Sequence, residues 1–174
     1  MLDSFGRKVD YVRISVTDRC DLRCKYCMPV SNPNFYNKDE ILTLQKLKII
    51  SSALIELGMK KVRITGGEPL VRKDIIQYLK FLSDKLKKKE INELLLTTNG
   101  TQLNKHAKTL SDFGIKRINV SLDSLIAEKF NFITNGGNLE KVLQGIFAAQ
   151  KNKISIKINT VLLKKFNDDE IVSI

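Results

Sequence analysis

Three cysteines crowded into one short segment are the feature that most restricts this chain. Cys20, Cys24 and Cys27 are its only cysteines. A disulfide framework would spread an even number of cysteines along the sequence, so this pattern indicates a metal centre in a reducing compartment. Three thiolates on a tight loop can hold three irons of a [4Fe–4S] cluster, whereas proteins that only carry electrons normally supply four cysteines. The missing fourth cysteine predicts an open iron, which is typical of a chemical rather than a structural metal site.

A structural zinc ion is the main alternative for these cysteines. Zinc would require a fourth cysteine or histidine ligand. The only histidine is His106, which we expect to be exposed, one turn into a helix beyond the third strand. Zinc is therefore disfavoured.

The rest of the chain alternates strands with helices. We expect strands at residues 11–16, 61–65, 93–98, 117–122 and 154–162, and helices at about 43–57, 74–86, 104–113 and 139–150. Gly58 and Gly114 end two of these helices, and Asn167 followed by Glu170 is typical of another helix start. Repeated strand–helix alternation predicts an α/β fold with a parallel sheet and right-handed crossovers.

One face of the expected strands is polar and the other is apolar. The apolar face carries residues such as Ile64, Val120 and Ile158, whereas the polar face carries Arg13, Ser15, Arg63, Thr65, Asn119, Ser121, Asp123, Lys157 and Asn159. Side chains two residues apart share one face of a strand. A closed eight-stranded barrel fills its interior with branched apolar residues. A polar interior favours a wider, open barrel around a polar ligand, and a sheet with one solvated face is the alternative.

The sequence GGEP (residues 66–69) follows the second expected strand, at the carboxyl edge where α/β proteins bind ligands. Together, the cysteine triplet with Tyr26 before its last cysteine and this GGEP turn resemble the radical S-adenosylmethionine (radical SAM) superfamily. A narrower resemblance is to the molybdenum cofactor biosynthesis protein A family, the GTP 3′,8-cyclases. It is carried by residues 13–20 (RISVTDRC), 27–29 (CMP), 63–70 (RITGGEPL), 96–100 (LTTNG) and 118–123 (INVSLD), and extends from about Gly6 onward.

The resemblance implies a fold and a reaction. The fold would be a partial TIM-like parallel barrel of repeated βα units, truncated after about the fifth strand, with residues 1–174 as the N-terminal portion of the radical SAM core domain. The open iron would bind SAM, and an electron from an external one-electron reductant would yield a 5′-deoxyadenosyl radical. That radical would convert GTP to (8S)-3′,8-cyclo-7,8-dihydroguanosine 5′-triphosphate, the substrate of a downstream cyclic pyranopterin-forming protein.

The resemblance also assigns roles to individual residues. The three cysteines would bind the [4Fe–4S] cluster. SAM would contact Tyr26, Gly66, Gly67, Glu68 and Ser121. GTP would contact Arg13, Arg63, Thr97 and Lys157. The last group includes cations from three strands, which suits a triphosphate. If these cations were merely structural, buried carboxylates would have to neutralise them, and Asp123 is the clearest candidate.

Members of this family continue well past the present length and add three more cysteines for a second cluster that binds guanine. We therefore expect this chain to be a fragment with little or no complete activity, and a homodimer is left open. Two other functions also stay open. One is a different radical SAM enzyme, for instance a peptide-modifying one. The other is a non-enzymatic metal-binding module that contacts nucleic acid through its basic surface.

Charge and hydropathy bear on these alternatives. The chain has 30 Lys and Arg against 19 Asp and Glu, a formal net charge of +11, which favours anionic ligands. It lacks the aromatic-studded basic pattern of single-strand binders, so we expect no nucleic acid partner. No apolar run approaches the ~20 residues of a membrane helix, and no signal peptide is evident. We therefore expect a cytoplasmic protein without a membrane partner.

Overall fold

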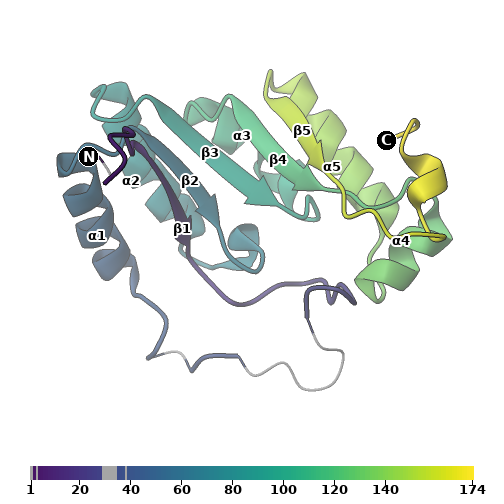
Figure 1. Cartoon of the computed structure of the whole chain (residues 1–174). Coiled ribbons are helices and arrows are strands. Elements are labelled where there is room, and N and C mark those ends of the chain that lie inside the picture. Colours follow the sequence, from purple (N-terminus) through teal and green to yellow (C-terminus); the bar gives the residue numbers. More distant parts are fainter. Residues whose placement is uncertain (1, 3, 29–34, 38) are drawn as a thin grey trace.

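The computed structural model describes residues 2, 4–28, 35–37 and 39–174, and a five-stranded parallel sheet lies at its centre (Figure 1). The strands are β1 (Tyr11–Ser15), β2 (Lys61–Thr65), β3 (Glu93–Thr98), β4 (Arg117–Ser121) and β5 (Ser155–Asn159), in the spatial order β1-β2-β3-β4-β5. Each strand pairs with the next one along the chain, as in the wall of a βα barrel. Within the described residues the sheet stays open, with β1 and β5 as its edges. The predicted α/β class and partial barrel are consistent with this arrangement.

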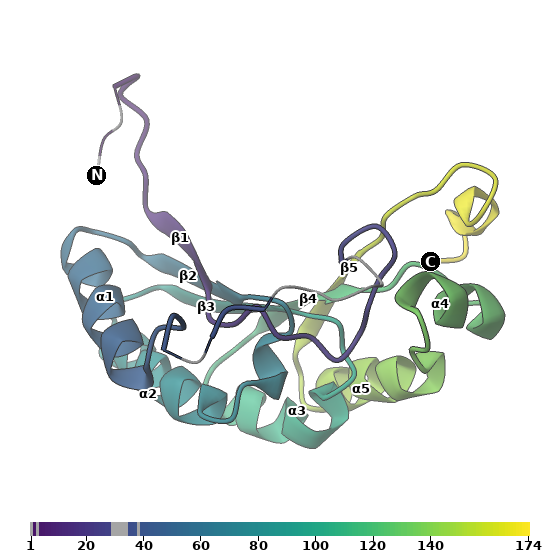
Figure 2. The same ribbon diagram turned by 90° about the horizontal axis from the view of Figure 1, so that it is seen from below.

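The helices are α1 (Leu44–Glu56), α2 (Ile75–Lys87), α3 (Leu103–Asp112), α4 (Ala127–Thr134) and α5 (Leu139–Lys151), with short 3-10 turns η1 (Pro69–Val71) and η2 (Asp168–Glu170). Figure 2 shows α1, α2, α3 and α5 on one side of the sheet. Thr43 and Asn138 start two of these helices by accepting hydrogen bonds from the amides of Lys46 and Lys141. No helix in the described part of the chain is both long and apolar enough to cross a membrane.

The hydrophobic core fills the space between this helical layer and the sheet. The strands contribute residues such as Ile64, Leu96 and Ile118, and the helices contribute Leu79 and Leu110, all of which are fully buried. Each strand contributes the side chains of one face to this core. Because side chains alternate along a strand, the other side chains point to the opposite face, which no helix covers in Figure 2.

The helix-free face carries the polar residues that the sequence predicted. Arg13 on β1 pairs in register with Arg63 on β2. Further along the sheet, Thr97 on β3 pairs with Asn119 on β4, which pairs with Lys157 on β5. The alternation in β1, β2, β4 and β5 therefore predicted correctly which of their side chains share the helix-free face, whereas β3 places the buried Leu95 on that face beside Arg63.

Three parts of the chain differ from the sequence-based expectation. Helix α4 was not predicted, and the last strand ends at Asn159 rather than at Leu162. The helix expected to start at Asn167 is only the 3-10 turn η2, because the Asn167 side chain makes no cap. The side-chain amide of Asn167 instead donates through Nδ2 to the carbonyl oxygens of Asp123 and Val161. Tertiary contacts thus use the polar atoms that would have capped a longer helix.

Candidate functional site

The cysteine segment follows β1 and lies at the carboxyl edge of the sheet (Figure 1). Cys20 and Cys24 are partly buried, whereas Cys27 is exposed. The amides of Cys27 and Met28 both donate to the Cys24 carbonyl oxygen, at 2.9 and 3.0 Å, which folds Cys24–Cys27 into a tight turn. We call residues 20–28 the cysteine loop; Pro29, the last residue of the CMP match, lies outside the described residues.

Helix α4 supports the first half of the cysteine loop. The amides of Arg23 and Lys25 donate to the carbonyl oxygens of Thr134 and Ile133, at 3.1 and 2.9 Å. The last carbonyls of a helix have no partner within the helix, so they are available to bind the loop backbone. Leu22 is buried in the core beside these contacts. The helix that the sequence reasoning missed is therefore part of the site's foundation.

Polar side chains after β3 hold the start of the loop. Asp21 accepts hydrogen bonds from Asn99 Nδ2 at 2.7 Å, Thr101 Oγ1 at 2.6 Å and Gln102 Nε2 at 3.3 Å. Burial raises the Asp21 pKa, but these hydrogen bonds outweigh it and hold the pKa below its usual value. Asn99 Nδ2 also lies 3.6 Å from Cys20 Sγ. Asn99 belongs to the LTTNG motif, which the sequence reasoning noted without assigning this residue a role.

Gly66 and Gly67 are required because the chain before Cys20 packs directly on them. A Cβ on Gly66 would lie 2.6 Å from the Thr17 carbonyl oxygen, and one on Gly67 would lie 2.3 Å from that of Arg19. The amides of Gly67 and Glu68 donate to these two carbonyls, both at 2.7 Å. The close approach expected of the glycines is therefore made to this protein's own backbone.

Glu68 is fully buried beneath the cysteine loop. Its Oε1 accepts from the Leu70 amide at 2.9 Å and from Thr98 Oγ1 at 2.8 Å, and its Oε2 accepts from the Asn99 amide at 2.6 Å. Burial raises the pKa of Glu68 to about 7 despite these hydrogen bonds, and no cation pairs with it among the described residues. Glu68 thus joins the GGEP turn to the end of β3.

Tyr26 lies between two of the cysteines and reaches the end of β4. Its hydroxyl donates to Asp123 Oδ2 at 2.7 Å. Burial, together with this hydrogen bond and the negative charge of Asp123, raises the Tyr26 pKa well above its usual value. Burial also raises the pKa of Cys24 to about 11 and raises that of Cys20, so these thiols hold their protons until a cation displaces them.

The donor set of the cysteine loop suits an iron–sulfur cluster, because such a cluster takes cysteine thiolates, each on a different iron. The amide of Leu22, at 3.4 Å, and Asn99 face Cys20 Sγ, where they would stabilise a thiolate. His106 lies in α3 and is partly buried, not exposed as expected.

The expected GTP contacts lie on β1, β2, β3 and β5, on the helix-free face of the sheet. Arg63 is 8% exposed; its Nε donates to the Tyr11 hydroxyl at 2.7 Å and its Nη1 to Thr97 Oγ1 at 3.2 Å. Among the described residues, no carboxylate forms an ion pair with Arg13, Arg63 or Lys157. Asp123, the internal partner considered for them, binds Tyr26 instead. The face therefore holds uncompensated positive charge, which favours an anionic ligand.

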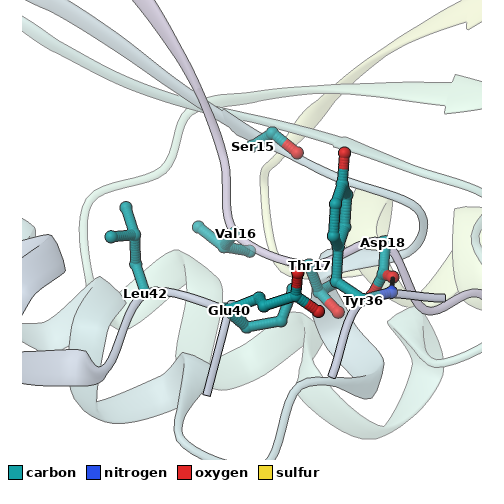
Figure 3. Close-up of a pocket in the computed structure, with 8 residues that line it drawn as sticks. Ser15, Val16, Thr17, Asp18, Tyr36, Glu40 and Leu42 are labelled. Carbon is teal, nitrogen blue, oxygen red and sulfur yellow. Dashed lines mark hydrogen bonds between the residues drawn. The ribbon is translucent and has the colours of Figure 1, made fainter. Parts of the chain in front are cut away.

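A separate pocket of about 590 Å³ opens beside the end of β1 (Figure 3). It is lined by residues 15–18, Tyr36 and residues 40–42. Its two carboxylates fix the local backbone, because Asp18 Oδ2 accepts from the Tyr36 amide at 2.6 Å and Glu40 Oε2 accepts from the Asn37 amide at 2.8 Å. Because two carboxylates line it, this pocket does not suit a triphosphate. It is a different site from the cationic face of the sheet.

Sequence comparison places these features among known proteins. The family model of the Radical SAM superfamily matches residues 14–174. The chain is 55% identical over 171 residues to the GTP 3′,8-cyclases of Brucella abortus (strain S19) and Brucella ovis. The match covers 98% of this chain and 49% of each relative. It therefore spans about half the length of the curated relatives it matches.

Comparison with solved structures agrees on the fold. Streptococcus suis SuiB superposes with a TM-score of 0.74 at 19% identity, over 94% of this chain and 35% of that chain. Native anSMEcpe with bound AdoMet superposes with a TM-score of 0.65 at 20% identity, over 85% of this chain and 42% of that one. These similarities support the fold rather than a particular activity.

We expect Gly67→Ala to displace the start of the cysteine loop, because the added carbon would overlap the Arg19 carbonyl. The loss in unfolding free energy should be about 1–3 kcal/mol, and Cys20 should react faster with an alkylating reagent. Gly6→Ala is the control, because nothing lies within 4 Å of its added carbon, although its φ of 73° brings backbone strain. Equal Cys20 reactivity in both variants would contradict the packing argument.

Because Glu68 is buried, we predict that the free energy of unfolding falls as pH rises. Its folded-state pKa of about 7 lies above the ordinary 4.5, so the folded chain binds this proton more tightly than the unfolded one. The contribution of this proton to the free energy of unfolding is complete below about pH 4.5. It is lost as pH rises through about 7, which lowers the free energy of unfolding by about 3 kcal/mol. Urea unfolding between pH 5 and 8 should show this slope, and Glu68→Gln should reduce it. Glu140→Gln, which changes an exposed carboxylate, should retain it, and an unchanged slope in Glu68→Gln would exclude Glu68 as its source.

Proposed function

This chain belongs to the radical SAM superfamily, and we propose that its 174 residues supply the SAM-cleaving and triphosphate-binding part of a GTP 3′,8-cyclase. The proposed overall reaction is the conversion of GTP to (8S)-3′,8-cyclo-7,8-dihydroguanosine 5′-triphosphate in molybdenum cofactor biosynthesis. The observation that carries the proposal is the pairing of a three-cysteine loop with uncompensated cations on the adjoining open face of the sheet. The 55% identity to proteins of that name supports the same assignment.

We propose that Cys20, Cys24 and Cys27 hold a [4Fe–4S] cluster whose fourth iron binds SAM. When bound, the cluster would supply the electron for cleavage of SAM to methionine and a 5′-deoxyadenosyl radical, which would take a hydrogen atom from the substrate. The protein's own part is to fix the loop through α4, Asp21 and the glycine turn. A rigid loop places the ligands with little reorganisation at the moment of reaction.

The SAM-binding residues we propose lie around this loop. Gly66, Gly67 and Glu68 form the turn beneath it, Tyr26 lies within it, and Ser121 ends β4 on the helix-free face. Gly67 is exposed, so its backbone is open to a ligand. The Glu68 carboxylate is enclosed by protein donors, so a direct SAM contact would require it to exchange one of them. Without such an exchange, Glu68 would act by holding the turn in place.

We propose that Arg13, Arg63, Thr97 and Lys157 bind the triphosphate of GTP. Arg13 and Lys157 are exposed on the open face, free to reach a ligand. Arg63 is already oriented by Tyr11 and Thr97, which lowers the entropy cost of binding. Charge-assisted hydrogen bonds from three strands can fix a phosphate chain, whereas guanine would need a site beyond these residues.

The wider context is also a proposal. The chemistry requires an external one-electron reductant, and its product suits a downstream cyclic pyranopterin-forming protein. Three free thiols are compatible with the reducing cytoplasm. We further propose that residues 1–174 form the N-terminal portion of a longer radical SAM core, because they match only 49% of their relatives' length.

Substitution of Arg63 tests the proposed substrate site. In anaerobic titrations of the reconstituted protein, Arg63→Ala should weaken GTP binding about tenfold or more, because a charge-assisted contact contributes about 1.5–3 kcal/mol. The change that SAM produces in the spectrum of the reduced cluster should be retained. Lys108→Ala, which removes an exposed cation paired with Asp112 on α3, should leave both ligands unaffected. Equal loss of GTP and SAM binding would mean that Arg63 is structural, and unchanged GTP binding would place the substrate elsewhere.

A further inference from the structure

Asp123 is a buried carboxylate that the proposed reaction does not use. It follows β4 and is 2% exposed. Its two oxygens bind groups from different parts of the chain: Oδ2 accepts from the Tyr26 hydroxyl at 2.7 Å, and Oδ1 accepts from the Val161 amide at 2.9 Å. One carboxylate thus joins the cysteine loop to the segment after β5.

The position of Asp123 is fixed independently of the cysteine loop. Asn167 is fully buried and donates through Nδ2 to the Asp123 carbonyl oxygen at 2.6 Å. Thr160 Oγ1 donates to the carbonyl oxygen of Leu122, the preceding residue, at 2.8 Å. The backbone at Asp123 is therefore held from two directions, and its side chain is held by Val161. Asp123 is the rigid member of the contact with Tyr26.

The second half of the cysteine loop has few other attachments. Arg23 and Lys25 bind α4, but the amides of Cys27 and Met28 bond only within the loop. Among the described residues, the hydroxyl of Tyr26 makes the one hydrogen bond that joins residues 26–28 to another element. Tyr26 is 44% exposed, so packing alone holds it weakly. The Asp123 contact therefore sets where the turn between Cys24 and Cys27 lies.

We propose that Asp123 is a positioning residue, which acts through the Tyr26 hydroxyl to present Cys24 and Cys27 to the iron–sulfur cluster. The inference rests on the cluster proposed above. The two can fail separately: a wild-type chain that binds no cluster overturns the proposed function, whereas a cluster indifferent to this contact overturns only the present inference.

The variants that separate position from charge follow from hydrogen-bond chemistry. Tyr26→Phe removes the hydroxyl and keeps the ring. Asp123→Asn removes the charge but can keep both contacts, because its oxygen can accept from Val161 while its amide donates to the Tyr26 oxygen. Asp123→Ala removes both contacts; if that variant does not fold, Tyr26→Phe still tests the proposal.

Two measurements test the proposal. The first is iron release from the reconstituted protein to a ferrous chelator under anaerobic conditions, with the paramagnetic resonance spectrum of the reduced cluster recorded in parallel. Tyr26→Phe should release iron at least fivefold faster than the wild type and alter the spectrum. Asp123→Asn should stay within twofold of the wild type. The second is hydrogen exchange in the cluster-free chain, where Tyr26→Phe should speed exchange in residues 24–28.

Tyr78→Phe is the matched control. Tyr78 is fully buried in α2, and its hydroxyl shares a hydrogen bond with Ser51 Oγ at 2.5 Å, away from the cysteine loop. This variant should lower the stability of the fold while leaving iron release unchanged. Wild-type behaviour of Tyr26→Phe, or an equal acceleration by Tyr78→Phe, would overturn the proposal. Fast release from Asp123→Asn would also overturn it, in favour of a charge effect.

Discussion

The site depends on the backbone contact between the GGEP turn and the chain that enters the cysteine loop. Two amides of the turn bind the carbonyls of Thr17 and Arg19, and this is possible only because residues 66 and 67 lack a Cβ. The contact joins β1 to β2 beyond the end of their ladder and places the first cysteine above the sheet. Glu68 then joins the same turn to the end of β3, so three strands fix the origin of one loop.

The sheet separates stability from function by its two faces. The apolar face, covered by helices, supplies the hydrophobic core that stabilises the fold. This leaves the opposite face free to carry side chains whose charge would destabilise a closed apolar barrel. Arg13, Arg63 and Lys157 have no carboxylate partner among the described residues. The unpaired charges of the neighbouring Arg13 and Arg63 are a cost that an anionic ligand would relieve.

The sequence predicts those features that depend on local pattern. Alternation identified the strands and their polar face, and helical spacing identified α1, α2, α3 and α5. Helix α4 escaped prediction because its own side chains show no strong helical pattern and no side-chain cap, and its role lies in the carbonyls it offers to the cysteine loop. The sequence did not predict the contacts of Asp123, Asn167 and Glu170, because their hydrogen-bond partners lie 38 to 46 residues away along the chain. The metal and ligand roles of the cysteines, SAM residues and cations stay predictions from the sequence.

The central claim is that three cysteines on a scaffold-fixed loop hold a four-iron cluster with one open position. Iron and acid-labile sulfide analysis of the anaerobically reconstituted chain tests it most directly. The account predicts about four irons and four sulfides per chain, and their loss in Cys24→Ala, because two thiolates cannot retain the cluster. Stoichiometric zinc without sulfide, in the wild type, would contradict it.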